Sequence, residues 1–260
     1  MAEHAPAPPP AVAHLPAIER TIALMRAHMH EPLAIDDLAA AAYLSPFHFS
    51  RVFRRATGVP PGEFLTALRL DAAKRLLLTT PLSVTEICYE VGYASLGTFT
   101  TRFTALVGLP PTALRRLASD PSPERVATLR SPAPTIATGG LVAVHLIGPP
   151  GWHGTICCGL FPRPLPAGAP AACALASKIG RCLLGPAPPG RYALLAAAMP
   201  RRDDPRAYLL PDSELLVGAA WPVSVSAGLA ADMVLHLRPP RATDPPVVVA
   251  LPLLLARFAP

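Results

Sequence analysis

Ser45-Pro46-Phe47-His48-Phe49-Ser50-Arg51-Val52-Phe53-Arg54-Arg55-Ala56-Thr57-Gly58 is the segment that decides the fold of the first half of this chain. Ser45 is a residue type that caps helix N-termini, and Pro46 suits a first helical turn. Gly58 can adopt the positive φ at which helices commonly stop. The segment therefore predicts a helix over residues 46–57.

Two faces are expected on this helix. Phe49, Val52 and Phe53 recur at the spacing of one helical stripe, so we expect them to face a core. The remaining surface carries cationic and hydrogen-bonding side chains and one aromatic ring: Phe47, His48, Ser50, Arg51, Arg54 and Arg55.

The segment has a second copy. Fifty positions on, Ser95, Phe99, Phe103 and Gly108 repeat Ser45, Phe49, Phe53 and Gly58. The offset falls to 49 further upstream, because Val91-Gly92-Tyr93 replaces the shorter Ala42-Tyr43. A helix, a tight turn and a second capped helix, present twice, predict two helix-turn-helix units.

The flanking sequence predicts the other helices. An apolar stripe runs from Ile18 to Met29, and Asp36-Asp37 suits the first turn of the next helix. Pro60-Pro61 starts a connector of about twenty residues between the two units. Ser83-Val84-Thr85-Glu86 matches a capping box, and Thr112–Leu117 predicts a last short helix.

Length and charge suggest two domains. A chain of 260 residues with a net charge of +6 can hold two ordinary domains. Residues 1–130 hold 13 basic and 11 acidic side chains, so bulk charge does not indicate nucleic-acid binding. Basic residues gather locally over residues 47–75. We expect a disordered tail over residues 1–16, a helical domain over 17–118 and a linker over 119–133.

Residues 134–260 have a different pattern. Short apolar runs separated by Pro and Gly turns predict a mostly-β, sandwich-like or barrel domain. The expected strands are Leu141–Ile147, Thr155–Phe161, Ala172–Ala176, Cys182–Leu184, Tyr192–Ala198, Leu215–Val225, Met233–Leu237 and Val247–Leu251. The predicted fold is thus an all-α double helix-turn-helix domain followed by a mostly-β sandwich-like domain.

A family resemblance covers about residues 18–117. Ile35-Asp36-Asp37-Leu38-Ala39, the quoted segment, Arg69 to Leu77, Val91-Gly92-Tyr93 and Phe103 to Pro111 together resemble the DNA-binding domain of AraC/XylS-type transcription regulators. The resemblance implies seven helices and two recognition helices that enter successive major grooves, which lie about 34–36 Å apart. It also implies promoter DNA and RNA polymerase as partners.

The resemblance also implies the site residues. Phe47, His48, Ser50 and Arg51 are expected to face bases, with Arg54 and Arg55 at phosphates. The whole candidate set is Ser45, Phe47, His48, Ser50, Arg51, Arg54, Arg55, Ser95, Leu96, Gly97, Thr98, Thr100, Thr101 and Arg102. His48, Arg54 and Arg55 could instead be solvated surface residues.

One departure from the family weakens the second unit. Thr101 stands where the family commonly has a basic residue, and Arg102 lies about 100° further around the helix. We therefore expect the first unit to supply more of the affinity.

The role of the second half stays open between three alternatives. It could sense a small molecule, act as a thiol sensor through its cysteines, or serve as a dimerisation or partner-docking module. Trp152, His153, Tyr192, Trp221 and His236 are candidates for an effector cleft, and core packing would explain them equally well. Cys157 and Cys158 point to opposite faces of a strand and do not pair easily.

Catalysis, cofactors and metals are not expected. The chain has no Gly-rich phosphate loop, no H-E-x-x-H pair and no G-x-S-x-G elbow. Its five cysteines contain no C-x-x-C pair that would suggest a zinc site. Cys88 is expected to be inert core. No apolar run approaches the ~20 residues of a membrane helix, so a cytoplasmic protein is expected.

Overall fold

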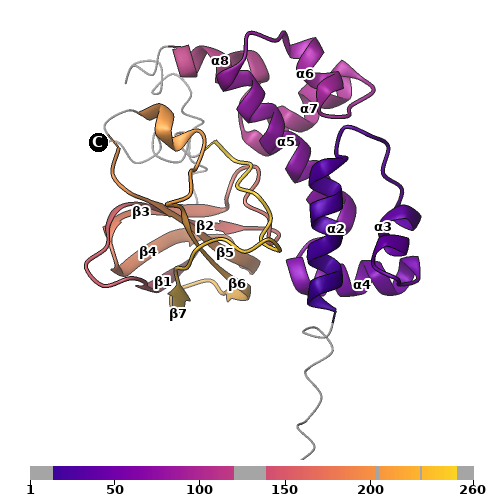
Figure 1. Cartoon of the computed structure of the whole chain (residues 1–260). Coiled ribbons are helices and arrows are strands. Elements are labelled where there is room, and N and C mark those ends of the chain that lie inside the picture. The colour runs from indigo at the N-terminus through magenta and orange to yellow at the C-terminus, as the bar shows by residue number, and fades with distance from the viewer. Residues whose placement is uncertain (1–13, 120–138, 203–204, 229, 251–260) are drawn as a thin grey trace, which may run out of the picture.

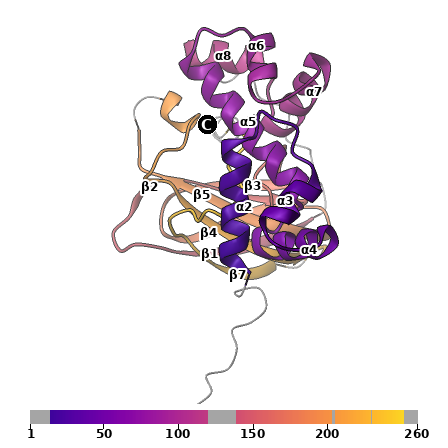
Figure 2. The same ribbon diagram turned by 45° about the vertical axis from the view of Figure 1, so that its right-hand side comes forward.

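The computed structural model describes residues 14–119, 139–202, 205–228 and 230–250. Helices come first along the chain, and a β-sandwich lies beside them (Figure 1). The view turned by 45° brings part of the helical half in front of the sandwich (Figure 2). Apart from Ser119, the expected linker over residues 119–133 falls outside the described residues.

The helical half contains both expected helix-turn-helix units. Its helices are α2 (Leu15–Ala27), α3 (Ile35–Ala41), α4 (Pro46–Thr57), α5 (Pro61–Thr79), α6 (Val84–Glu90), α7 (Leu96–Val107) and α8 (Pro111–Ser119). Helix α2 begins at Leu15, so residues 15 and 16 are helical and do not belong to the expected disordered tail. The remainder of that tail, residues 1–13, is outside the described part.

Helices α4 and α7 end as the glycines predict. Gly58 follows α4 with φ of 82°, and Gly108 follows α7 with φ of 92°. At the N-termini the two copies differ. The Ser95 hydroxyl accepts a hydrogen bond from the Thr98 N–H at 3.4 Å, whereas the Ser45 side chain makes no capping bond. Ser45 thus lies at the N-cap position, as expected, but its side chain does not form the expected capping hydrogen bond.

Aromatic rings form the core of each unit. Phe49 lies 5.5 Å from Phe53, and Phe53 packs edge-on against Phe64 of α5 at 5.4 Å. In the second unit, Phe99 and Phe103 are also 5.5 Å apart. All five rings are fully buried, as the spacing predicted for the four in α4 and α7. Such offset and edge-on pairs contribute about 0.5–1.5 kcal/mol each beyond their buried area.

Seven strands follow in two sheets. They are β1 (Gly140–Ile147), β2 (His153–Phe161), β3 (Ala172–Lys178), β4 (Gly180–Ala187), β5 (Gly190–Met199), β6 (Leu216–Val225) and β7 (Ala230–His236), with the short 3-10 helix η1 (Pro205–Tyr208) before β6. One sheet has the order β4-β1-β7 and the other β3-β2-β5-β6. Only the β1–β7 pair is parallel among the pairings of these strands.

The two sheets pack face to face as a sandwich. Alternate residues such as Val144 of β1, Ile156 of β2 and Leu194 of β5 fill the core between them. Cys158 and Cys182 meet in this core, where the Cys158 thiol is hydrogen bonded to Cys182. This bond, and after it burial, raise the pKa of Cys158. Cys157 points to the opposite face of β2, as expected from the alternation.

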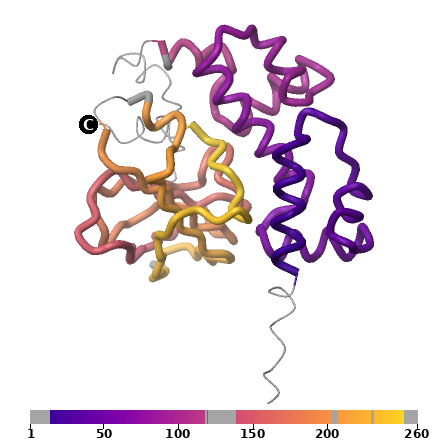
Figure 3. Tube along the Cα trace, in the orientation of Figure 1, coloured from indigo at the N-terminus to yellow at the C-terminus, as the bar shows by residue number. Residues whose placement is uncertain are grey.

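The last expected strand is not part of either sheet. Residues 244–250, here called the strap, run between the sandwich and the helices (Figure 3). Val248 and Ala250 join the helical core, whereas Val249 packs on the outer face of the four-stranded sheet. The apolar run Val247–Leu251 was expected to form a strand, and this is wrong, because two different cores bury its side chains in place of a sheet. Leu251 itself is outside the described residues.

Polar contacts join the halves as well. Lys74 of α5 is buried, and its Nζ donates to the Val247 carbonyl at 2.5 Å. The β2–β3 loop, residues 162–171, reaches the other helices. Its Arg163 forms a 2.7 Å ion pair with Glu63, and the Gly168 N–H donates to the Leu106 carbonyl at 2.6 Å.

Gly92 gives a test of the second turn. Its φ is 83°, and a Cβ built there would lie 2.6 Å from the Met29 carbonyl oxygen. Gly92→Ala should therefore destabilise the protein by about 2 kcal/mol or more, since both backbone strain and overlap act. Gly62→Ala is the matched control, because a Cβ on Gly62 meets nothing within 4 Å.

Where Ala can adopt the native backbone conformation, replacing Gly by Ala stabilises by about 0.4–1 kcal/mol, so Gly62→Ala in the first turn of α5 should be neutral or stabilising. Chemical denaturation of both variants measures the difference. Equal stability of the two variants would contradict the assigned turn.

Candidate nucleic-acid interface

The first recognition helix presents the expected polar face. Arg51, Arg54 and Arg55 are exposed, and Phe47 has 79% of its surface exposed. An aromatic ring this exposed does not contribute to the core, which is already filled by Phe49 and Phe53. The face therefore offers three cations and one apolar ring to a partner.

Arg51 is held in place by two of its neighbours. Its Nη2 lies 3.3 Å from Nδ1 of His48, and its guanidinium carbon lies 5.8 Å from the centre of the Phe47 ring. A cation–π contact at an exposed site is worth about 0.5–1 kcal/mol. His48 is itself packed edge-on against His14 at 5.5 Å. The contacts restrict Arg51 before any partner arrives.

Ser50 and Ser45 contribute hydroxyl groups. Ser50 is half-buried, and its Oγ donates to the Pro46 carbonyl at 2.9 Å. Its own lone pairs remain able to accept a hydrogen bond. Ser45 is exposed at the start of α4.

The second recognition helix presents a less charged face. Its candidate residues that are exposed are the N-cap Ser95 and, in α7 itself, Leu96, Gly97, Thr98, Thr101 and Arg102, while Thr100 is half-buried. A Cβ on Gly97 would have only the Ser95 Oγ nearby, at 3.8 Å, so the start of α7 is open to close approach. Arg102 is thus the single cation of the α7 sequence, as noted from the sequence.

Arg102 of α7 lies near Arg69 of the connector helix α5. Burial raises the pKa of Tyr93, while the positive charges of Arg102 and Arg69 oppose that rise. The Arg69 guanidinium lies 5.9 Å from the centre of the same Tyr93 ring. Arg102 therefore shares its surroundings with a second cation and a phenol ring.

Sequence reasoning missed an exposed aromatic residue in the first turn. Tyr43 is 87% exposed and has a positive φ of 56°, which is uncommon for a residue with a side chain. It sits just before α4, where the second copy has Gly92. The signal in the sequence was that the first turn is one residue shorter than the second.

A groove between α4 and the sandwich was also not foreseen. Arg51, Arg54 and Arg55 line one side, and Pro162, Arg163 and Trp221 from the sandwich line the other. The second half thus places a further cation and an indole ring beside the recognition helix.

Metal-ligand clusters and membrane-spanning helices are two further features that would indicate a function. Within the residues that the structure describes, no three His, Cys, Asp or Glu side chains gather as a metal site. None of the described helices has the length and apolar character needed to cross a membrane.

The comparisons with known proteins concern the helical half. A family model described as a helix-turn-helix domain matches residues 38–117. The transcriptional activator AarP of Providencia stuartii is 31% identical over 98 residues, which is 38% of this chain and 73% of that protein. An uncharacterized regulator of Bacillus subtilis, YobQ, is 34% identical over 95 residues, 36% of this chain. These relatives are named as transcription regulators, not as enzymes.

Most of the length of the first relatives is not shared. The match covers 39% of YobQ and 26% of the regulator GbdR of Pseudomonas aeruginosa. Among solved structures, the DNA-binding domain of AdpA in complex with a target DNA is 33% identical, with 41% of this chain and 97% of that chain covered and a TM-score of 0.39. With AarP matched over 73% of its length, this chain belongs to the AraC-type family of helix-turn-helix transcription regulators.

Proposed function

We propose that the chain is a bacterial, cytoplasmic regulator that binds promoter DNA with α4 and α7 in two adjacent major-groove segments. One observation carries this proposal. In each helix, two Phe residues at the same spacing are buried in the core, and the opposite face is polar and exposed. Because α5 connects the two units, one chain would read two segments without a second copy.

The two helices would contribute unequally. In α4, Arg51 can form the paired hydrogen bonds that guanine offers in the major groove, and Phe47 can contact a thymine methyl group. Arg54 and Arg55 would neutralise phosphates. In α7, the Thr hydroxyl and methyl groups would add shape and weaker hydrogen bonds. The first unit would thus supply more of the affinity and of the base discrimination.

The second half would regulate this binding, either by sensing an effector or by assembly. A specific observation favours assembly. On the three-stranded sheet, Leu141, Ile147, Leu183 and Val234 have 38–56% of their surfaces exposed. Exposed apolar groups on one sheet are typical of protein–protein contacts. Dimerisation, or docking of a partner such as RNA polymerase, is therefore the second candidate role.

Thiol sensing receives less support. Burial raises the pKa of Cys157 to about 12, and the pKa of Cys158 is raised as well. Reactive thiols need a lowered pKa, because the thiolate is the reactive form. The hydrogen bond with Cys158 lowers the pKa of Cys182, but this thiol is buried in the sandwich core.

Arg51 and Arg54 should have different effects on DNA binding. Arg51→Ala should relax base preference in one half of the site, with a loss of about 1–3 kcal/mol of discrimination. Arg54→Ala should weaken all sequences alike and lower the salt slope by about 1. Fluorescence-anisotropy titrations at several salt concentrations, on selected and random DNA, measure both. Unchanged base preference in Arg51→Ala would show that the assigned face is wrong.

Thr101→Arg should place a cation on α7 at the position where the family commonly has one. We expect tighter but less selective binding, with a salt slope steeper by about 0.9, because one more phosphate would be neutralised. The same titrations provide the measurement. Thr112→Arg adds the same charge at an exposed position of α8, outside α7, and serves as the control. If affinity did not change, the exposed face of α7 would not meet DNA.

The spacing of the two half-sites tests the proposal as a whole. DNA selected by the full chain from random sequence should contain two half-sites about 10 base pairs apart. Inserting about 5 base pairs between them moves one half-site to the opposite face of the duplex. Affinity should then fall toward the non-specific level, which is typically ~10³-fold weaker or more. Full affinity after the insertion would mean that only one unit reads DNA.

A further inference from the structure

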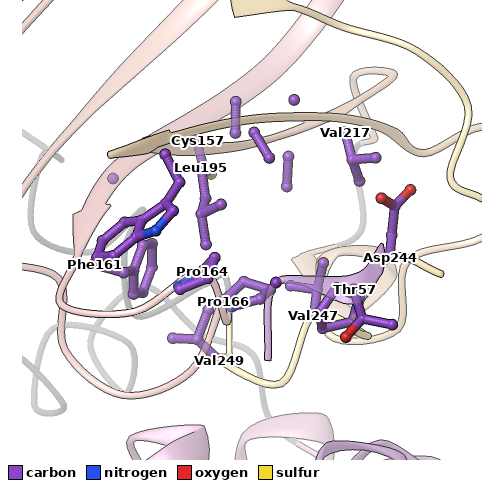
Figure 4. Close-up of a pocket in the computed structure, with 18 of the residues that line it drawn as sticks. Thr57, Cys157, Phe161, Pro164, Pro166, Leu195, Val217, Asp244, Val247 and Val249 are labelled. Carbon is purple, nitrogen blue, oxygen red and sulfur yellow. The ribbon is translucent and has the colours of Figure 1, made fainter. Parts of the chain in front are cut away.

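A cavity of about 260 Å³ lies where the sandwich meets the helices (Figure 4). The outer face of the four-stranded sheet forms one wall, with Cys157, Leu195 and Val217. Pro164 of the β2–β3 loop and Val249 of the strap form the opposite wall. The last residues of α4, Ala56 and Thr57, and the Gly58 that follows close one end. Residues from both halves of the chain line this cavity.

Most of the walls are apolar, and the charged Arg238 and Asp244 at one end form an ion pair with each other. The polar groups at the Asp244 end already have partners within the chain. Arg238 donates to both carboxylate oxygens of Asp244 at 2.7 and 2.9 Å, and the Arg241 N–H donates to the same carboxylate at 2.6 Å. The Thr57 hydroxyl lies 2.9 Å from the carbonyl oxygens of Phe53 and of Val59. A charged or strongly polar guest would therefore lose its hydration without compensation.

The volume sets the size of the guest. An apolar cavity of about 150 Å³ takes up benzene, so 260 Å³ has room for a somewhat larger molecule. We propose that this cavity binds a neutral apolar molecule of one or two rings, and that its occupancy changes how the sandwich sits against α4.

The link to α4 is direct contact. Thr57 is buried in the wall, and a Cβ built on Gly58 would lie 3.1 Å from Cγ of Pro164. The same loop continues through Pro162 and Arg163 into the groove beside Arg51, Arg54 and Arg55. A guest between the sheet and Thr57 would shift this loop relative to the recognition helix. This second part rests on the proposed DNA binding, whereas uptake of the guest does not.

Thermal unfolding of the full chain tests uptake. Toluene and indane are the probes, and benzoate, which matches toluene in shape but is charged, is the ligand control. At about ten times its dissociation constant, toluene should raise Tm by about 3 °C. Benzoate should leave Tm unchanged. No shift with either hydrocarbon would overturn the site, and an equal shift with benzoate would overturn its apolar character.

Cavity-filling variants locate the site. Ala197 of β5 is buried and lines the cavity, so Ala197→Phe should weaken toluene binding by at least about tenfold. Ala197→Leu is the milder variant if the larger ring prevents folding. Ala227→Phe adds the same ring in the exposed turn between β6 and β7, outside the cavity lining, and should bind toluene as the parent does. Equal binding by all variants would place the probe elsewhere and overturn the assignment.

Anisotropy titrations on selected DNA test the coupling. Saturating toluene should change DNA affinity about fivefold or more, in the range of ordinary allosteric coupling, and Ala197→Phe should not respond. If toluene binds and DNA affinity stays the same, the coupling is wrong while the proposed function stands. If the chain binds no DNA in either state, the proposed function fails, and the thermal shifts alone decide on the cavity.

Discussion

The buried ammonium group of Lys74 is the constraint around which the two halves are joined. Its Nζ donates to the Val247 carbonyl at 2.5 Å and lies 3.6 Å from Asp71. Burial lowers the pKa of Lys74, which means that the charged form is disfavoured where it lies. Release of the strap would return this charge to water. The apolar contacts of Val248 and Val249 favour docking, while the buried charge opposes it, so the joint differs from an ordinary hydrophobic core.

The helical half could be predicted from sequence because its determinants are local. Gly58 and Gly108 end their helices at positive φ, and the Phe spacing fixes which face is buried. The repeat strengthened each expectation by a second, independent copy. The expected tail boundary at residue 16 and the expected hydrogen bond of the Ser45 cap both differ from the structure, because tertiary packing can override local propensity. The exposed candidate residues follow directly from the buried ones.

The joint between the halves could not be predicted, because it depends on contacts across long sequence separations. The pattern of the strap indicated a strand, yet Val248 and Val249 pack into different cores. Nothing in the sequence around Cys158 indicates that it meets Cys182 across the sandwich. The groove beside α4 likewise depends on where the β2–β3 loop lies. Local patterns determine elements, whereas the docking of two domains depends on surfaces assembled from many elements.

The sandwich touches the ends of both recognition helices, but in different ways. At α7 it forms backbone hydrogen bonds, from the Gly168 and Ala250 N–H groups to the carbonyls of Leu106 and Val107. At α4 it makes side-chain contacts and leaves a cavity next to Thr57. Hydrogen bonds fix a distance, whereas a cavity allows the walls to move. We therefore infer that α4, the helix with the three exposed cations, is the one whose position the sandwich can change, so regulation would act on the unit that is proposed to supply most of the affinity.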